Sequence, residues 1–122
     1  MSDQILVLVV EDEALVRVVL VDVLEEAGFR VIEAEHAAAA LEVLELYASQ
    51  IHVLFTDIHM PGAMNGIELA HHAAASWPKV ALLITSAQPY PTQSQMPLNA
   101  LFLSKPYRHD RVIYHIRELA RA

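Results

Sequence analysis

Four groups of polar residues follow apolar stretches that are typical of buried strands. The stretch VLFTDIHMPG, residues 53 to 62, is the clearest case: an apolar run ends on Asp57, and the chain then turns at Pro61 and Gly62. An unpaired carboxylate is costly to bury, so we expect Asp57 at the open end of its strand. The other groups are the pairs Glu11–Asp12, Thr85–Ser86 and Ser104–Lys105.

Carboxylates, a hydroxyl and an ammonium group are the side chains that phosphoryl chemistry needs. Three carboxylates that lie close together raise one another's pKa, and a divalent cation would relieve their repulsion. Hard oxygen ligands select Mg²⁺ or Ca²⁺, and one or two carboxylates that share the ion with phosphate oxygens favour Mg²⁺. A carboxylate can also act as a nucleophile and form an aspartyl-phosphate. Lys105 would pair with the negative charge of the phosphoryl group, and the hydroxyl of Ser86 would donate a hydrogen bond to a phosphoryl oxygen.

Strands and helices that would position these groups alternate along the chain. Strands are predicted over 5–10, 30–34, 51–56, 80–85 and 100–103, and helices over 14–27, 36–48, 66–77 and 108–122. Unbroken β-branched runs such as 5–10 are typical of strands buried on both faces, as in parallel sheets. The alternation predicts right-handed βαβ units and one parallel sheet covered by helices on both faces. Ligands of such sheets bind outside the carboxyl ends of the strands, where all four polar groups fall.

The stretch AQPYPTQSQMPLN, residues 87 to 99, breaks this rhythm. It contains Pro89, Pro91 and Pro97 and shows no helical period. Proline removes a backbone donor and clashes with the preceding turn. A regular helix between the fourth and fifth strands is therefore not expected.

Composition excludes several classes of protein. The 122 residues fit a single domain, 1–122, and 55% of them are apolar, which is enough for a core. A net charge of −7 lacks the basic footprint of a nucleic-acid binder. The chain has no cysteine, no signal-peptide pattern at its start and no apolar run long enough for a membrane span. We expect an acidic cytoplasmic protein with neither nucleic acid nor membrane as partner.

Five short motifs, each after its own predicted strand, carry a resemblance to a known family. They are VVEDE at 9–13, TDIHMPG at 56–62, Gly66, SA at 86–87 and KPY at 105–107. Over nearly the whole chain the sequence resembles the response-regulator receiver domains of two-component signalling. The resemblance implies an α/β, flavodoxin-like, doubly wound sheet of five parallel strands in the order 2-1-3-4-5. Because the spacing from residue 86 to 105 is shorter than is usual in the family, its fourth helix is expected to be missing or irregular.

The resemblance also implies roles for the acidic residues. Asp57 would accept a phosphoryl group from a histidine kinase or a histidine phosphotransfer protein. Asp12 and Asp57 would ligate Mg²⁺ together with the backbone carbonyl of His59, and Glu11 would help through a water molecule. His59 would also tune the access of water to the phosphoryl group, unless it is simply an exposed loop histidine.

Further roles fall on residues after the fourth and fifth strands. Ser86 would bind a phosphoryl oxygen and move with it, Lys105 would form an ion pair with the phosphoryl group, and Phe102 would be the switch aromatic. The bond before Pro106 resembles the family's cis peptide. Adjacent strand residues point to opposite faces, so Thr85 remains the alternative to Ser86.

The first helix carries apolar residues on its polar side. Leu15, Val18 and Val21 are expected to dock a kinase or phosphotransfer partner, together with Pro106 and Tyr107 beside the lysine. Contiguous exposed apolar groups often mark interaction sites. The alternative is an apolar helix partly covered by its neighbours.

Two rival functions remain open. The chain could be a pseudo-receiver, a binding module that is never phosphorylated. It could also be a phosphatase with an aspartate nucleophile, although such enzymes have a second acid where His59 stands. A receiver is not a turnover enzyme, because it is consumed as the substrate. With no room for an output domain after the last helix, we expect a stand-alone relay or switch that acts on an unknown downstream protein, or a fragment of a longer chain.

Overall fold

The computed structural model describes residues 4–121 and, within them, five strands and four α-helices. The strands are β1 (Leu6–Val10), β2 (Arg30–Ala34), β3 (Val53–Asp57), β4 (Ala81–Ser86) and β5 (Leu101–Ser104). The helices are α1 (Ala14–Glu26), α2 (Ala37–Tyr47), α3 (Gly66–Ser76) and α4 (His109–Arg121). Every element lies within two residues of its predicted bounds, and position 122 of the last predicted helix is outside the described residues.

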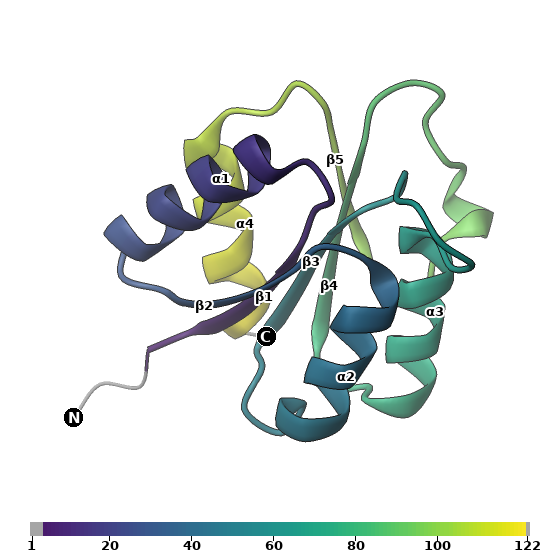
Figure 1. Ribbon diagram of the computed structural model, residues 1–122, viewed down its shortest axis with the longest axis horizontal. Coiled ribbons are helices and arrows are strands. Elements are labelled where there is room, and N and C mark those ends of the chain that lie inside the picture. Colours follow the sequence, from purple (N-terminus) through teal and green to yellow (C-terminus); the bar gives the residue numbers. More distant parts are fainter. Residues whose placement is uncertain (1–3, 122) are drawn as a thin grey trace.

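All five strands are parallel and lie in the order β2-β1-β3-β4-β5, so the predicted fold is confirmed (Figure 1). The register brings the last residues of the strands to the same edge of the sheet. Val10 at the end of β1 pairs with Ala34 and with Thr56, and Asp57 pairs with Thr85. Residues that follow β1, β3, β4 and β5 therefore share this edge.

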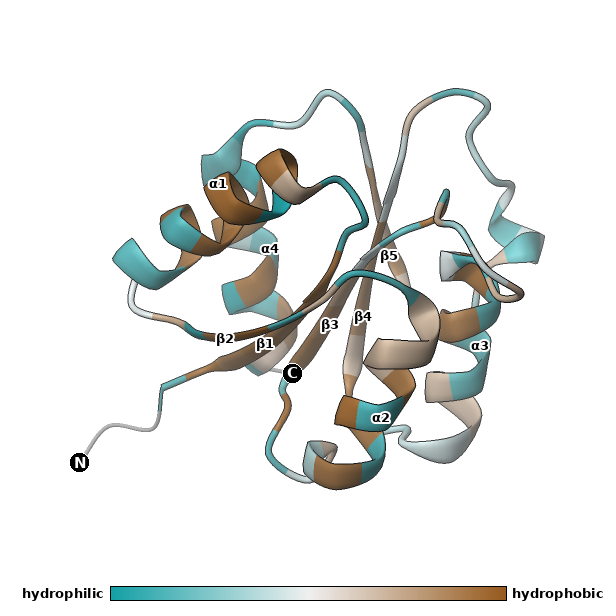
Figure 2. Cartoon of the chain, viewed as in Figure 1, coloured by the Kyte–Doolittle hydropathy of each residue, from teal (hydrophilic) through white to brown (hydrophobic). Residues whose placement is uncertain are grey.

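Helices cover both faces of the sheet, as Figure 1 shows. Alternate residues of β1 point to opposite faces, and each set joins a separate core. Leu8 packs with Leu44 of α2 and Leu69 of α3, whereas Val9 packs on the other face with helices α1 and α4. Figure 2 shows the hydrophobic colour running along the central strands. The two cores hold the sheet between the helices and fix the edge on which the polar residues lie.

The irregular segment, residues 87–99, contains a 3₁₀ turn (Gln93–Gln95) in place of a helix, as predicted. The Oε1 of Gln95 accepts a hydrogen bond from the backbone N–H of Thr92 at 2.8 Å and caps this turn. The peptide bond between Gln88 and Pro89 is cis, a feature that the sequence did not suggest.

Within residues 4–121, no helix is long and apolar enough to cross a membrane.

Candidate functional site

Asp57 is the last residue of β3 and is only 6% exposed. Its Oδ1 accepts a hydrogen bond from the backbone N–H of His59 at 3.2 Å. The next residue, Ile58, continues the ladder by donating to the carbonyl of Thr85 at 3.0 Å. The carboxylate is thus held at the strand's end with one oxygen bonded to the loop that follows.

Gly66 packs directly against the backbone of Asp57. Its N–H donates to the carbonyl of Ile58 at 2.9 Å. A Cβ at this position would overlap the carbonyl oxygen of Asp57 and come within 2.8 Å of the Cα of Ile58. Only glycine allows the first turn of α3 to approach the end of β3 so closely, which gives a physical reason for a residue that the sequence identified only by resemblance.

Lys105 reaches from the end of β5 to both buried carboxylates. Its Nζ lies 2.5 Å from Oδ2 of Asp57 and 3.7 Å from Oε1 of Glu11. Burial lowers the pKa of Lys105, but the hydrogen bond and charge of Asp57 and the charge of Glu11 outweigh it, so its pKa is raised. The peptide bond to Pro106 is cis, as predicted.

Glu11 is buried at the end of β1, and its pKa is raised. Burial is the main cause, and the charges of Asp57 and Asp12 add to it. A hydrogen bond from the backbone of Glu13 to Oε2, at 3.0 Å, and the charge of Lys105 act in the opposite direction. The raised pKa of Glu11 therefore reflects its burial first, and the charges around it contribute less.

The predicted cluster of three carboxylates is only partly assembled. Glu11 and Asp57 share Lys105, whereas Asp12 is exposed to solvent. In the part of the chain that the structure describes, no three His, Asp or Glu side chains are grouped as a metal site.

The donor atoms of this edge nevertheless fit a hard divalent cation. The carboxylates of Glu11, Asp12 and Asp57 supply oxygen donors here, and the charges of Asp57 and Asp12 both act on Glu11. Oxygen ligands and surplus negative charge are what Mg²⁺ prefers.

The two candidate hydroxyls lie on opposite faces of β4. Ser86 is fully buried on the face of Phe102, and its Oγ donates to the carbonyl of Ala87 at 2.8 Å. Thr85 shares the face of Asp57, and its buried Oγ1 has no hydrogen-bond partner among residues 4–121. In the described part of the chain, neither hydroxyl forms a hydrogen bond with Asp57. The assignment of Ser86, rather than Thr85, as the hydroxyl that binds a phosphoryl oxygen therefore stays a prediction.

Phe102 and His59 flank the site differently. Phe102 is partly buried, and its ring centroid lies 5.7 Å from that of Tyr90. His59 is exposed at the mouth, with its backbone rather than its ring in contact with Asp57. Their predicted switch and water-gating roles remain predictions.

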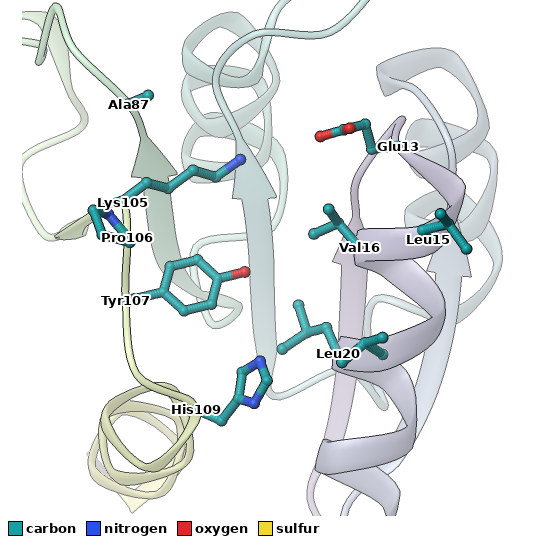
Figure 3. A pocket seen from close by; sticks show the side chains of 10 residues that line it. Glu13, Leu15, Val16, Leu20, Ala87, Lys105, Pro106, Tyr107 and His109 are labelled. Atoms are coloured by element: carbon teal, nitrogen blue, oxygen red, sulfur yellow. The ribbon is translucent and has the colours of Figure 1, made fainter.

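An apolar groove of about 660 Å³ runs between α1 and the residues after β5. Figure 3 shows Lys105, Tyr107 and His109 on one side and Leu15, Val16 and Leu20 of α1 on the other. We call this the α1 groove; its full lining is Glu13, Leu15, Val16, Val19, Leu20, Ala87, Lys105, Pro106, Tyr107 and His109. Burial raises the pKa of Tyr107, whose ring packs edge-on against Phe55.

The predicted docking residues of α1 need one correction. Leu15 is 81% exposed and Val18 is exposed, as predicted, whereas Val21 is partly buried. Neither Val18 nor Val21 lines the groove, and the docking role of all three stays a prediction. Val19, which is 51% exposed, lines the groove together with Leu15. At 100° per residue Val19 lies 40° from Leu15, whereas Val21 lies 120° away, so a wheel centred on Leu15 would have found Val19.

The sequence alone assigned no role to Arg17 of α1. Its guanidinium donates to the backbone carbonyl of Glu11 at 2.6 Å and to Oε1 of Glu33 at 2.9 Å. In the sequence, only the position of Arg17, a basic residue one turn into the helix that follows an acidic loop, indicated that it could contact this loop.

Comparisons with known proteins agree with this geometry. The family model of the response regulator receiver domain matches residues 7–117. The response regulator receiver protein CpdR of Brucella abortus (strain 2308) is 34% identical over 116 residues, which cover 93% of this chain and 88% of CpdR. A cyclic di-GMP phosphodiesterase of Thermotoga maritima is 35% identical over 81 residues, which cover 66% of this chain and 21% of that longer protein.

Among solved structures, a response regulator receiver protein of Sinorhizobium medicae WSM419 has a TM-score of 0.90 and 25% identity, covering 98% of this chain and 97% of that one. Fold, order of motifs and the lysine–carboxylate edge thus lead to one assignment. The chain belongs to the response regulator receiver domain family of two-component signalling.

Proposed function

We propose that this receiver domain accepts a phosphoryl group on Asp57 in a magnesium-dependent reaction and passes the signal on through protein contacts. One observation carries the proposal: the buried carboxylate of Asp57 bonds Lys105 Nζ at 2.5 Å, with Glu11 beside it. A carboxylate ion-paired with a lysine at the mouth of a parallel sheet is placed to act as a nucleophile and to have the product's charge neutralised.

In the proposed reaction, a carboxylate oxygen of Asp57 attacks the phosphorus of a phosphohistidine. A P–O bond forms as the P–N bond breaks, and the leaving imidazole takes up a proton from solvent. Lys105 then pairs with a phosphoryl oxygen, and Ser86 donates a hydrogen bond to another. Glu11, Asp12, Asp57 and the carbonyl of His59 would hold Mg²⁺, which supplies charge neutralisation for the transferring group.

The donor would be a histidine kinase or a histidine phosphotransfer protein in the cytoplasm. The α1 groove is adjacent to Lys105, and its apolar lining by Leu15, Val19, Pro106 and Tyr107 suits the apolar face of a helix. Val18, exposed on the same helix, extends this surface. Val18→Glu should slow transfer from a histidine donor but leave phosphorylation by a small phosphodonor unchanged.

Intact mass spectrometry after incubation with acetyl phosphate and Mg²⁺ tests the proposal. The mass of the wild type should rise by one phosphoryl unit, whereas Asp57→Asn and a chelator-treated sample should not change. A wild type that stays unmodified under these conditions would support the second candidate, a binding module that is never phosphorylated.

A further inference from the structure

Arg17, in the first turns of α1, connects the acidic loop, residues 11–13, with the end of β2. Its Nη1 donates to the carbonyl of Glu11 at 2.6 Å, and its Nε donates to Oε1 of Glu33 at 2.9 Å. The side chain is only 17% exposed, so water competes poorly for these bonds. A planar guanidinium suits two acceptors at once in a way that a lysine ammonium does not.

Every polar group of Glu11 has a partner. Its N–H donates to the carbonyl of Ala34 at 3.1 Å, Oε2 accepts from the N–H of Glu13, and Oε1 faces Lys105. Arg17 holds the remaining group, the carbonyl. That carbonyl shares one planar peptide unit with the N–H of Asp12, so the bond from Arg17 fixes the plane from which the Asp12 side chain departs.

The charge of Arg17 would act against a magnesium site. The charges that shift the pKa of Glu11 are those of Lys105, Asp57 and Asp12. A further cation near the carboxylates would repel Mg²⁺ by Coulomb's law. If Arg17 acts through its charge, replacing it by a neutral residue should strengthen Mg²⁺ binding. If it acts by positioning the loop, the same replacement should weaken Mg²⁺ binding.

We infer that Arg17 is a positioning residue for the magnesium site: it fixes the peptide plane between Glu11 and Asp12, and with it the direction in which the Asp12 side chain leaves the backbone, and is itself held by Glu33. The inference rests on the proposed function, because it concerns the same site.

Magnesium titration of the folded protein, by calorimetry or by amide chemical shifts, measures this role without any phosphorylation. Arg17→Met should weaken Mg²⁺ binding about tenfold, in the range found for partners of metal ligands. Arg17→Lys keeps the charge but not the fork and should also weaken binding. The matched control is Arg30→Met, which removes the same charge at the opposite end of β2 and should bind Mg²⁺ at least as tightly as the wild type. Unchanged or tighter binding in both Arg17 variants would overturn the inference.

Variants of Glu33 provide a second test of the inference. Glu33→Gln should weaken Mg²⁺ binding about threefold, as expected for a half-exposed ion pair. In the Arg17→Met background the same change should have no further effect, because Glu33 acts only through Arg17. Equal losses in both backgrounds would show that Glu33 acts independently and would contradict the chain of contacts.

Hydrogen exchange in metal-free protein separates this inference from the proposed function. In Arg17→Met the amides of Glu11 and Glu13 should exchange about tenfold faster, because the loop opens locally, while the midpoint of urea unfolding confirms that the variant is folded. Unchanged exchange would mean that Arg17 does not hold the loop. A failure of the proposed function appears instead in the wild type alone, as absence of Mg²⁺ binding or of phosphorylation.

Discussion

The two loops that flank the site are held in different ways. In the acidic loop, residues 11–13, Glu11 is buried; its N–H, carbonyl and Oε2 are hydrogen-bonded, and its Oε1 lies 3.7 Å from Nζ of Lys105. The irregular segment, residues 87–99, is mostly exposed and is attached at a few points. Its Tyr90 ring packs on Phe102, and its Gln95 carbonyl bonds Nε2 of His71 on α3 at 2.8 Å.

This difference matches what each loop would do in a receiver domain. Charges that meet a phosphoryl group must be held in place before it arrives, because positioning is most of the catalysis. A segment that transmits a signal needs two arrangements of similar free energy, which few contacts and an exposed backbone allow. We therefore expect rigidity on the β1–β3 side of the site and adjustment on the β4–β5 side.

The largest effect should come from Gly66→Ala, at the rigid side. The added Cβ would overlap the carbonyl of Asp57, so α3 or the end of β3 must shift. We expect the free energy of unfolding to fall by about 3 kcal/mol, at the upper end of overpacking costs, as measured by urea denaturation.

Gly62→Ala is the matched control. Gly62 has a φ of 105° but open space around its Cα, so alanine there meets only backbone strain. Its cost should be about 1 kcal/mol. Equal losses at both glycines would mean that contact with Asp57 is not what restricts residue 66.

Lys105→Met should have the next largest effect. It leaves the buried carboxylates of Asp57 and Glu11 without their cation and should cost about 2 kcal/mol, less than for a fully buried pair because Lys105 is partly exposed. Mg²⁺ should restore part of this loss by binding the folded state.

Urea unfolding with and without Mg²⁺ measures both effects, and Lys79→Met, an exposed lysine elsewhere, is the control. If Mg²⁺ restores none of the free energy of unfolding that Lys105→Met loses, then Lys105 and Mg²⁺ do not bind the same carboxylates.

Tyr90→Ala tests the adjustable side. Removing the ring from Phe102 should lower the free energy of unfolding by about 1 kcal/mol, the size of an aromatic pair. Leu98→Ser, at a side chain that is 97% exposed, should change stability by less than about 0.5 kcal/mol. A loss at Tyr90 as large as that at Gly66 would remove the contrast between the loops.

The smallest effect is local. Amide exchange across residues 90–98 should change when a beryllofluoride phosphate mimic binds, whereas exchange in the acidic loop should stay slow in both states. Strong and unchanged protection of 90–98 in both states would show that this segment does not respond to phosphorylation.

Sequence predicted the fold well for a physical reason. Strands buried on both faces need unbroken apolar runs, and β1 and β3 have them, so the positions of Asp57 and Glu11 at the strand ends followed directly. The absence of a helix in the irregular segment followed from its prolines.

Contacts between segments could not be predicted in the same way. The bond from Arg17 to the carbonyl of Glu11, the partial burial of Val21 and the close approach of Gly66 to Asp57 all depend on how a helix is rotated and placed against the sheet. The exposure of Asp12 next to the buried Glu11 likewise depends on how the chain turns after β1, which sequence spacing does not specify.

The most direct measurement is phosphate-affinity electrophoresis of the wild type and of Asp57→Asn after mixing with a phosphorylated histidine donor and Mg²⁺. A retarded band in the wild type that is absent in Asp57→Asn is the predicted result. Equal retardation of both proteins, or of neither, would contradict the assignment of Asp57 as the phosphoryl acceptor.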